Sequence, residues 1–202
     1  FLFDKLYCWE YITVGMLSQY LFQFFLFVTG ITYTILLLNR KRAGPFINIF
    51  YSAFMVYIMY RSRHYASMTI YIYASIMSMI TFKTWSGQER FIPHWETKKD
   101  LGKFSIGAIA LFFVIYCILR FKLAAPSPVL DAMHFTLKIG AYIFTARKSI
   151  ESLLCFVAGD TIMVGMFAYT QQFILSSSYV VYVIIQFKGF LDWKKIIDNN
   201  KL

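Results

Sequence analysis

Charged residues are scarce in this sequence. Asp, Glu, Lys and Arg together make up 15% of its 202 residues, whereas 59% of the residues are hydrophobic and the mean hydropathy is +0.58. A soluble domain of this length needs more polar surface than this composition supplies. The shortage of charge therefore excludes a soluble globular protein and predicts an integral membrane protein, surrounded by the lipid bilayer.

The sequence also lacks the motifs that assemble the common types of catalytic site. It has no HExxH, no GxSxG, no glycine-rich phosphate loop and no cluster of Asp residues for a divalent metal. Its three cysteines, Cys8, Cys117 and Cys155, are too far apart in the sequence to indicate a disulfide framework or a metal site. These absences argue against an enzyme, a cofactor and a bound metal.

Apolar runs long enough to cross a bilayer are abundant. A helical span needs roughly 20 residues, and uninterrupted runs favour helices over barrel strands, whose side chains alternate. The sequence predicts an all-α integral membrane protein with seven transmembrane helices. Their expected ranges are Tyr11–Leu38, Pro45–Tyr60, Tyr65–Trp85, Lys103–Leu119, Pro128–Ala146, Ile150–Tyr169 and Phe173–Trp193.

Basic residues cluster at the ends of these apolar segments. Of the 20 Lys and Arg residues, 14 follow the first, third, fifth and seventh segments, and 5 lie on the opposite side. Because cytoplasmic loops carry an excess of Lys and Arg, this pattern predicts an N-terminus outside the cell and a C-terminus in the cytoplasm. The net charge of +10 is therefore explained by the basic residues of the cytoplasmic loops, and no nucleic-acid partner is expected.

A weak internal repeat relates the two halves of the sequence. A shift of 108 positions superposes Tyr71 on Tyr179 and aligns the basic residues at 39–42 with those at 146–148. Two three-helix units of the same orientation need an odd number of spans between them, which the fourth segment supplies. We therefore predict 3+1+3 parallel repeats. The expected parts are an N-terminal bundle over 1–85, a loop and linker helix over 86–122, and a C-terminal bundle over 123–202.

Ionisable side chains inside an apolar segment are costly, so we treat them as candidates for function. The segment 128–146 contains Asp131, His134 and Lys138 at i, i+3 and i+7, which places them on one helical face. Lys138 and Asp160 each lie nine residues from the cytoplasmic end of their segments, or roughly 13 Å. We predict a buried or water-bridged pair between these two, either as a structural contact or as part of a substrate site.

Aromatic and amide side chains recur on helical faces that would meet inside a bundle. Aromatic faces can sandwich a heterocycle, and amide or hydroxyl groups can bind a sugar. The same side chains also serve ordinary packing between helices. These further candidates for substrate binding are Tyr179, Tyr182, Gln186, Tyr71, Ser75, Gln19, Gln23, Asn48 and Ser52.

The cytoplasmic ends of the segments also carry structural signals. Trp85 and Trp193 each end an apolar segment, where tryptophan is commonly a membrane-interface anchor. Glu151 begins the sixth segment, where a carboxylate favours the helix dipole. The mixed-charge stretch 86–103 is expected to be a solvated linker.

The C-terminal half resembles a known family of membrane transporters. Arg147, Lys148 and Glu151 form an RK-x-x-E pattern, and Asp160 follows the Glu by nine residues, as in the PnuC vitamin transporters. The segment 65–85 is similar to the third helix of that family. The resemblance implies a SWEET-like fold and a homotrimer in the bacterial cell membrane. It also implies facilitated diffusion of a nucleoside-like vitamin or nucleoside, which a cytoplasmic kinase then traps by phosphorylation.

One part of the sequence departs from the family pattern. Nicotinamide riboside transporters of the family place Trp residues in the turn after the Glu, whereas this sequence has Leu153 and Phe156. Phe156 is therefore a candidate for contact with the substrate, and nicotinamide riboside, a deoxynucleoside, thiamine and riboflavin all stay open. Outside the family, the alternatives are a scaffold or a membrane-embedded enzyme built on His134 between Asp131 and Lys138.

Overall fold

The computed structural model describes residues 21–61, 64–85, 91–123 and 127–200. Within these ranges the chain is helical apart from short connections, which confirms the prediction of an all-α protein. The part of the first predicted segment before residue 21 lies outside the described residues. After the first helix, Leu21–Leu38, come α2 (Ala43–Arg61), α3 (Tyr65–Thr84), α4 (Lys98–Phe121), α5 (Pro128–Ala146), α6 (Glu151–Tyr169) and α7 (Phe173–Asn199).

Helices α4 and α7 extend well beyond their predicted ranges. Helix α4 begins at Lys98, ahead of the predicted Lys103, and α7 continues beyond the predicted Trp193 to Asn199. The side chain of Thr97 accepts a hydrogen bond at 3.2 Å from the backbone N–H three residues further on. This N-terminal cap satisfies one of the free N–H groups of α4 and fixes its early start.

Among the described residues, six helices are long and apolar enough to cross a membrane: the first helix, α2, α3, α4, α6 and α7. Helix α5 has 19 residues, as do α2 and α6, but it contains Asp131, His134 and Lys138. Large apolar side chains such as Ile106 and Phe121 are exposed on the outside of the bundle, as expected for a surface that faces lipid. The protein is therefore a multi-pass membrane protein.

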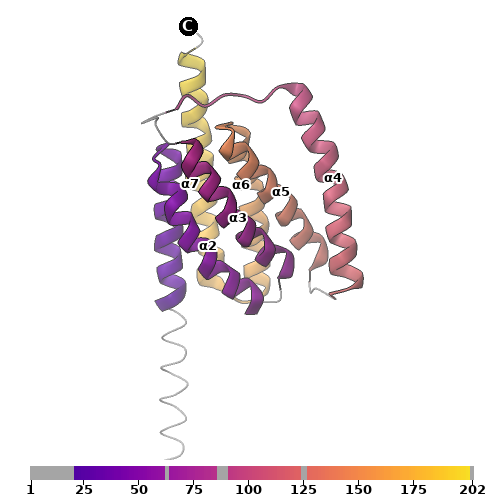
Figure 1. Cartoon of the computed structure of the whole chain (residues 1–202). Helices are drawn as coiled ribbons and strands as arrows, with labels where there is room; N and C mark the ends of the chain where they lie inside the picture. The colour runs from indigo at the N-terminus through magenta and orange to yellow at the C-terminus, as the bar shows by residue number, and fades with distance from the viewer. Residues whose placement is uncertain (1–20, 62–63, 86–90, 124–126, 201–202) are drawn as a thin grey trace, which may run out of the picture.

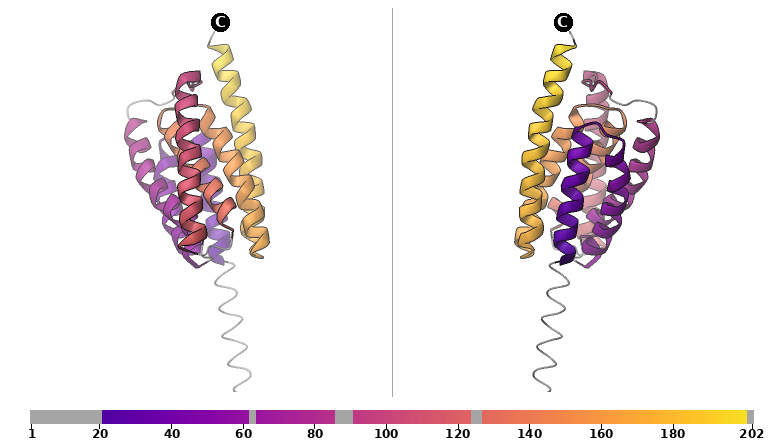
Figure 2. Two further views of the ribbon diagram at one scale, coloured as in Figure 1. Left: turned by 90° about the vertical axis from the view of Figure 1, so that its right-hand side faces the viewer. Right: turned by 90° about the vertical axis from the view of Figure 1, so that its left-hand side faces the viewer.

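The helices run side by side in one bundle with α4 at its edge (Figure 1). Helix α3 packs against α2 and α5, and α6 packs against α5 and α7. The side views show the C-terminal end of α7 extending beyond the other helices (Figure 2). Helix α4 contacts mainly α5, where Gly140 lets the ring of Phe104 approach within 2.4 Å of the position a Cβ would occupy. Leu119 is the single buried side chain of α4, so most of this helix is open to its surroundings.

The helix boundaries recur at the interval of the sequence repeat. Helices α2 and α6 both have 19 residues and begin at Ala43 and Glu151, 108 positions apart, and α3 and α7 begin at the same interval. Arg40 and Lys148, also 108 positions apart, both have a left-handed backbone with φ of 57° and 64°. Few non-glycine residues adopt this conformation. The turn before α2 and the turn before α6 therefore share one unusual backbone shape.

The segment 91–97, here called the strap, lies across the end of the bundle from which α7 protrudes (Figure 1). The His94 N–H donates to the carbonyl of Lys148 at 3.3 Å, and the His94 carbonyl accepts from the N–H of Ile150 at 3.0 Å. These two bonds pair the strap with the turn before α6. The prediction of a solvated linker is therefore wrong for this part of the loop.

Glu151 holds the strap from the first turn of α6. Its Oε1 accepts the backbone N–H of Glu96 at 2.9 Å, and its Oε2 accepts the hydroxyl of Ser149. Arg147 lies 3.7 Å from the Glu96 carboxylate, which adds a partly exposed ion pair. Glu151 thus joins two segments, a role beyond the expected interaction with its own helix dipole.

Trp85 and Trp193 are buried beneath the strap, with exposed fractions of 2% and 1%. The prediction that they are interface anchors is therefore wrong. The ring of Phe91 lies between them, with its centroid 4.6 Å from that of Trp85 and 5.5 Å from that of Trp193. The Trp193 indole N–H donates to the Leu38 carbonyl at 3.0 Å, and Arg40 Nη1 donates to the Phe91 carbonyl at 2.6 Å. These contacts tie the strap to helices from both halves of the chain.

Candidate functional site

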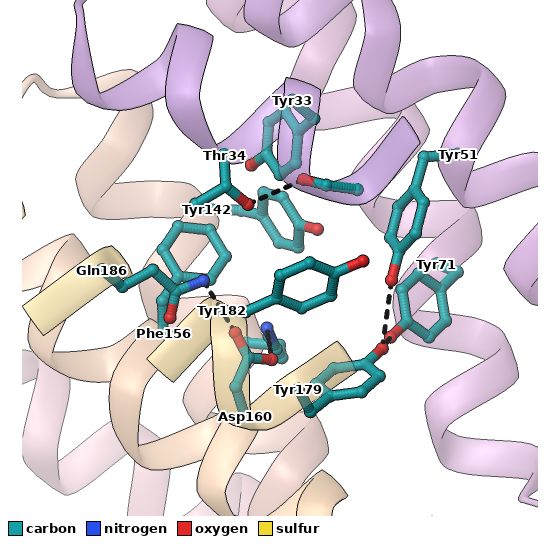
Figure 3. A pocket seen from close by; sticks show the side chains of 12 residues that line it. Tyr33, Thr34, Tyr51, Tyr71, Tyr142, Phe156, Asp160, Tyr179, Tyr182 and Gln186 are labelled. Atoms are coloured by element: carbon teal, nitrogen blue, oxygen red, sulfur yellow. Dashed lines mark hydrogen bonds and ion pairs between the residues drawn. The ribbon is translucent and has the colours of Figure 1, made fainter. Parts of the chain in front are cut away.

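A small polar and aromatic pocket lies in the interior of the bundle (Figure 3). The space between its lining side chains is about 20 Å³, which is room for about one water molecule. The first helix and α2, α3, α5, α6 and α7 all contribute to its walls. The lining residues are Gly30, Tyr33, Thr34, Tyr51, Tyr71, Lys138, Tyr142, Phe156, Asp160, Tyr179, Tyr182 and Gln186.

The predicted ion pair of Lys138 and Asp160 is present in this pocket. The Nζ of Lys138 lies 2.5 Å from Oδ1 of Asp160, and the two residues are 6% and 1% exposed. The second carboxylate oxygen accepts a hydrogen bond from Nε2 of Gln186 at 2.8 Å. Gly159 of α6 packs beside the Lys138 side chain, since a Cβ at this position would lie 3.4 Å from Cε of Lys138, an ordinary contact distance. Burial of two charges is tolerated because each satisfies the other.

Aromatic rings enclose the ion pair. The Nζ of Lys138 lies 4.7 Å from the centroid of the Phe156 ring, within the range of a cation–π interaction. Tyr142, one helical turn after Lys138, packs edge to face on Phe156 with centroids 5.4 Å apart. The ammonium group is therefore held between one carboxylate and one aromatic face.

Three tyrosine hydroxyls meet on the opposite wall of the pocket. The hydroxyl of Tyr179 on α7 lies 2.5 Å from that of Tyr71 on α3 and 3.2 Å from that of Tyr51 on α2. All three side chains are buried and point toward one another (Figure 3). This cluster supplies hydrogen-bond donors and acceptors at the edge of an aromatic surface, a combination suited to a planar polar ligand.

Tyr182 reaches across the pocket to the first helix. Its hydroxyl donates to the Phe27 carbonyl at 3.3 Å and lies only 2.0 Å from the position that a Cβ on Gly30 would occupy. The absence of a side chain at Gly30 is what lets this ring fit. Tyr182 therefore links α7 to the first helix at the wall of the pocket.

Asp131 and His134, two other predicted candidates, lie outside this pocket. The Asp131 carboxylate accepts the N–H groups of Ala66 and Ser67 at 3.2 Å and 3.0 Å, and it also accepts the Ser67 hydroxyl. The hydroxyl of Ser67 lies 3.0 Å from Nδ1 of His134. A carboxylate at the start of α3 satisfies free N–H groups and favours the helix dipole. These residues join α5 to α3 rather than lining the pocket.

His64 precedes α3 at this same junction and is buried. Burial lowers the pKa of the His64 imidazole, because the charged form loses its hydration, while the nearby Asp131 carboxylate raises that pKa by a smaller amount. Neither ring nitrogen of His64 has a hydrogen-bond partner among the described residues. A neutral imidazole tolerates this environment better than a charged one.

Two candidates on α2 are buried beside the pocket without lining it. Asn48 donates from Nδ2 to the Ser78 hydroxyl at 2.7 Å, a contact between α2 and α3. Ser52, the repeat counterpart of Asp160, is fully buried. Its hydroxyl makes no hydrogen bond to any residue that the structure describes.

The remaining candidates are not brought to the pocket. Ser75 is half-buried and donates to the carbonyl of Tyr71 in its own helix at 3.3 Å. Gln23 is buried on the first helix but is not a lining residue. Gln19 lies outside the described residues.

Some lining residues were not among the predicted candidates. Tyr142 had a usable signal, since it follows Lys138 by one helical turn on the same face. The first helix gave no comparable signal, because aromatic residues are spread around its circumference. The residues missed are Gly30, Tyr33, Thr34, Tyr51 and Tyr142.

The pocket offers binding groups of several kinds. It combines aromatic faces, tyrosine hydroxyls, one amide and one ion pair. In the described ranges, no group of three or more His, Cys, Asp or Glu side chains is placed to hold a metal ion. The groups present are suited to recognition of a small molecule.

Comparisons with known proteins give two matches. The sequence profile of a family described as nicotinamide mononucleotide transporter matches residues 20–195. The fold is similar to a crystal structure of the vitamin B3 transporter PnuC, with a TM-score of 0.77 and 14% sequence identity. That likeness covers 93% of this chain and 86% of the other, and at this identity it is a likeness of fold. A comparison with curated proteins gives no match.

Proposed function

The chain belongs to the nicotinamide mononucleotide transporter (PnuC) family, and we propose that it moves a nucleoside-like vitamin or a nucleoside across the membrane by facilitated diffusion. Membership in a transporter family is consistent with the predicted absence of enzymatic activity and excludes the scaffold alternative. The observation that carries the proposal is the buried pocket, in which aromatic rings, tyrosine hydroxyls and a charged pair from six helices converge.

The size of the pocket indicates how transport proceeds. Sites for small molecules typically have volumes of about 300–1,000 Å³, whereas this one leaves about 20 Å³. A substrate therefore enters only after helices or side chains move, and Tyr182, which reaches across the pocket to the first helix, is one side chain that would have to move. The compact pocket corresponds to a closed state between two open ones.

The recurrence of helix boundaries supports two equivalent halves. In the proposed arrangement, each half is a three-helix bundle and α4 is the linker, which gives 3+1+3 parallel repeats. This arrangement requires α5 to cross the membrane as well, in addition to the six apolar helices. The N-terminus is outside and the C-terminus is in the cytoplasm, in accordance with the distribution of Lys and Arg. The two halves rock about the pocket between them.

The substrate class follows from the lining of the pocket. Planar heterocycles stack on aromatic side chains, and the hydroxyls and the Gln186 amide can bind a sugar or a ring nitrogen. Nicotinamide riboside and a deoxynucleoside are the first candidates, and thiamine and riboflavin are the alternatives. A facilitator only equalises the concentration of free substrate, so continued uptake requires a sink, which a cytoplasmic kinase supplies by phosphorylating the substrate.

A homotrimer is proposed from the family resemblance, and the open apolar surface of α4 is available to face either lipid or a neighbouring copy. Ile106, Phe113 and Phe121 are exposed there, and α4 has few contacts within its own chain. A bacterial inner membrane is the proposed location.

Uptake into proteoliposomes tests the proposed function. The purified protein is reconstituted, and labelled thymidine, nicotinamide riboside, thiamine and riboflavin are offered with and without a pH gradient. We expect saturable uptake of at least one compound that stops at equal concentrations on both sides. Uptake of none of the four overturns the proposal, and accumulation driven by the gradient overturns the facilitated mechanism.

A further inference from the structure

Lys138 places a positive charge inside the pocket where a cationic substrate would have to bind. Its Nζ contacts both features that attract a cation, the Asp160 carboxylate at 2.5 Å and the face of Phe156 at 4.7 Å. Gly159 of α6 also flanks this side chain, since a Cβ there would lie 3.4 Å from Cε and 3.6 Å from Cδ of Lys138. The ammonium group thus already occupies the position that suits a ligand cation.

Both oxygens of the Asp160 carboxylate already have a partner. Oδ1 of Asp160 is used by Lys138 and Oδ2 by Gln186. Asp160 is the single acidic residue among those that line the pocket, and Lys138 is the single basic one. The lining of the pocket is therefore neutral overall.

We propose that Lys138 is a specificity-determining residue that selects uncharged heterocyclic substrates and rejects cationic ones. This inference rests on the proposed transport function and narrows its substrate class. An uncharged heterocycle that carries an N–H or hydroxyl donor fits the remaining groups, because Oε1 of Gln186 is buried and has no hydrogen-bond partner among the described residues. That amide oxygen can accept a bond from the ligand.

The expected preference for an uncharged ligand over a cationic one follows from the repulsion between Lys138 and the ligand charge. Two unit positive charges about 5 Å apart in a protein interior of effective dielectric about 20 repel each other enough to weaken binding on the order of a hundredfold. Stacking of a cation on one aromatic face recovers only about 2-fold to 30-fold. Because the Asp160 carboxylate also attracts a cation, the hundredfold is an upper limit, and we expect a net preference of about tenfold for an uncharged ligand.

A pair of ligands with one shape and different charge tests this inference. Nicotinamide riboside carries a positive pyridinium ring, whereas its reduced dihydro form is uncharged. Uptake and competition are measured in proteoliposomes for both forms and for thymidine, using the wild type, Lys138→Met and the double variant Lys138→Met with Asp160→Asn. Thermal unfolding and monodispersity of each variant report whether it folds.

We expect the wild type to prefer the uncharged form about tenfold. Lys138→Met leaves an unpaired carboxylate and is expected to raise the relative uptake of the cation by about 10-fold to 100-fold, and the double variant is expected to lose this gain. Equal transport of both forms by the wild type overturns the inference even where Lys138→Met fails to fold, and so does an unchanged ratio in a folded Lys138→Met. Uptake of no compound by the wild type overturns the proposed function itself, which separates the two failures.

Discussion

The hydroxyl groups of Tyr71 and Tyr179 lie 2.5 Å apart at the centre of the bundle, although 108 residues separate them in the chain. They are the same pair that the sequence repeat superposes, one on α3 and the other on α7. Their contact joins the two halves of the chain at the wall of the pocket. Several expected outcomes depend on this contact and on the groups around it.

Removing the Tyr179 hydroxyl is expected to weaken the junction between the halves. Tyr179→Phe leaves the buried hydroxyls of Tyr71 and Tyr51 without their shared partner, which costs about 1–3 kcal/mol in the free energy of unfolding. Tyr169→Phe is the matched control, because Tyr169 is exposed at the end of α6. Thermal unfolding in detergent compares the two variants. Equal stability of both would contradict the importance of the hydroxyl cluster.

Gly30 is expected to tolerate no side chain while Tyr182 keeps its position. Gly30→Ala places a methyl group 2.0 Å from the Tyr182 hydroxyl, an overlap expected to cost about 1–3 kcal/mol. Adding Tyr182→Leu to the same chain should recover part of that loss. Gly107→Ala, where a Cβ meets nothing within 4 Å, serves as the control and should not destabilise the protein. The clash is refuted if Gly30→Ala unfolds at the wild-type temperature.

The ion pair in the pocket is expected to show strong coupling in a double-mutant cycle. Asp160→Ala leaves a buried, unpaired Lys138 and is expected to destabilise the protein by about 3–5 kcal/mol. Lys138→Met in the same background should reduce the loss, because no charge remains to be buried. Denaturant or thermal unfolding of the four chains gives the coupling energy. Additive effects would mean that the two side chains do not depend on each other.

Docking of the strap onto the bundle is expected to depend on the ring of Phe91. Phe91→Ala removes the ring between Trp85 and Trp193 and should cost about 3–5 kcal/mol if the strap stays docked, or less if it detaches. Labelling of a cysteine introduced at Ser149, in a chain whose native cysteines are replaced by serine, distinguishes the two. Faster labelling with Phe91→Ala than without it indicates detachment. Ile92→Ala, at an exposed position beside Phe91, should leave the rate unchanged.

Acidification is expected to destabilise the junction between α3 and α5. Burial lowers the pKa of His64 in the folded protein, whereas the unfolded chain has an imidazole pKa of about 6.5. The unfolded state therefore binds more protons as the pH falls below about 6.5, and stability present at neutral pH is lost. Unfolding temperatures measured from pH 7.5 to 5 should fall, and His64→Gln should reduce the slope. An equal slope in His64→Gln would assign the effect to other groups, and His94→Gln is the exposed control.

The apolar runs and the residue spacing in the sequence predicted the helices and the depth of the ion pair well. Uninterrupted apolar runs set the helices of the described ranges, and the nine-residue spacing placed Lys138 and Asp160 at one depth. Both inferences depend on rise per residue and hydrophobicity, which act locally along the chain. These are the properties that a single sequence carries most directly.

Contacts that depend on the rotation of a helix about its axis, or on the path of a loop, could not be predicted from the sequence. His134 and Lys138 share one face of α5, yet only Lys138 reaches the pocket, because α5 passes from α3 at one end to α6 further along. Trp85 was predicted to be an interface anchor because it ends an apolar segment. Its burial under the ring of Phe91 depends on the path of the loop between them, which no local pattern in the sequence indicates. Tyr33 and Tyr51 lie in segments so rich in aromatic residues that no spacing distinguished them.

The polar character of α5 also has a consequence for how the protein is made. A Lys at the centre of a helix opposes insertion by about 2.5–3.5 kcal/mol, and α5 carries Lys138 near its centre and a second charged residue, Asp131, in its first turn. Their partners are the start of α3, which is synthesised earlier, and Asp160 on α6, which is synthesised later. Helix α5 would thus leave the translocon only once α6 has emerged, so that the two helices enter the lipid together as a hairpin.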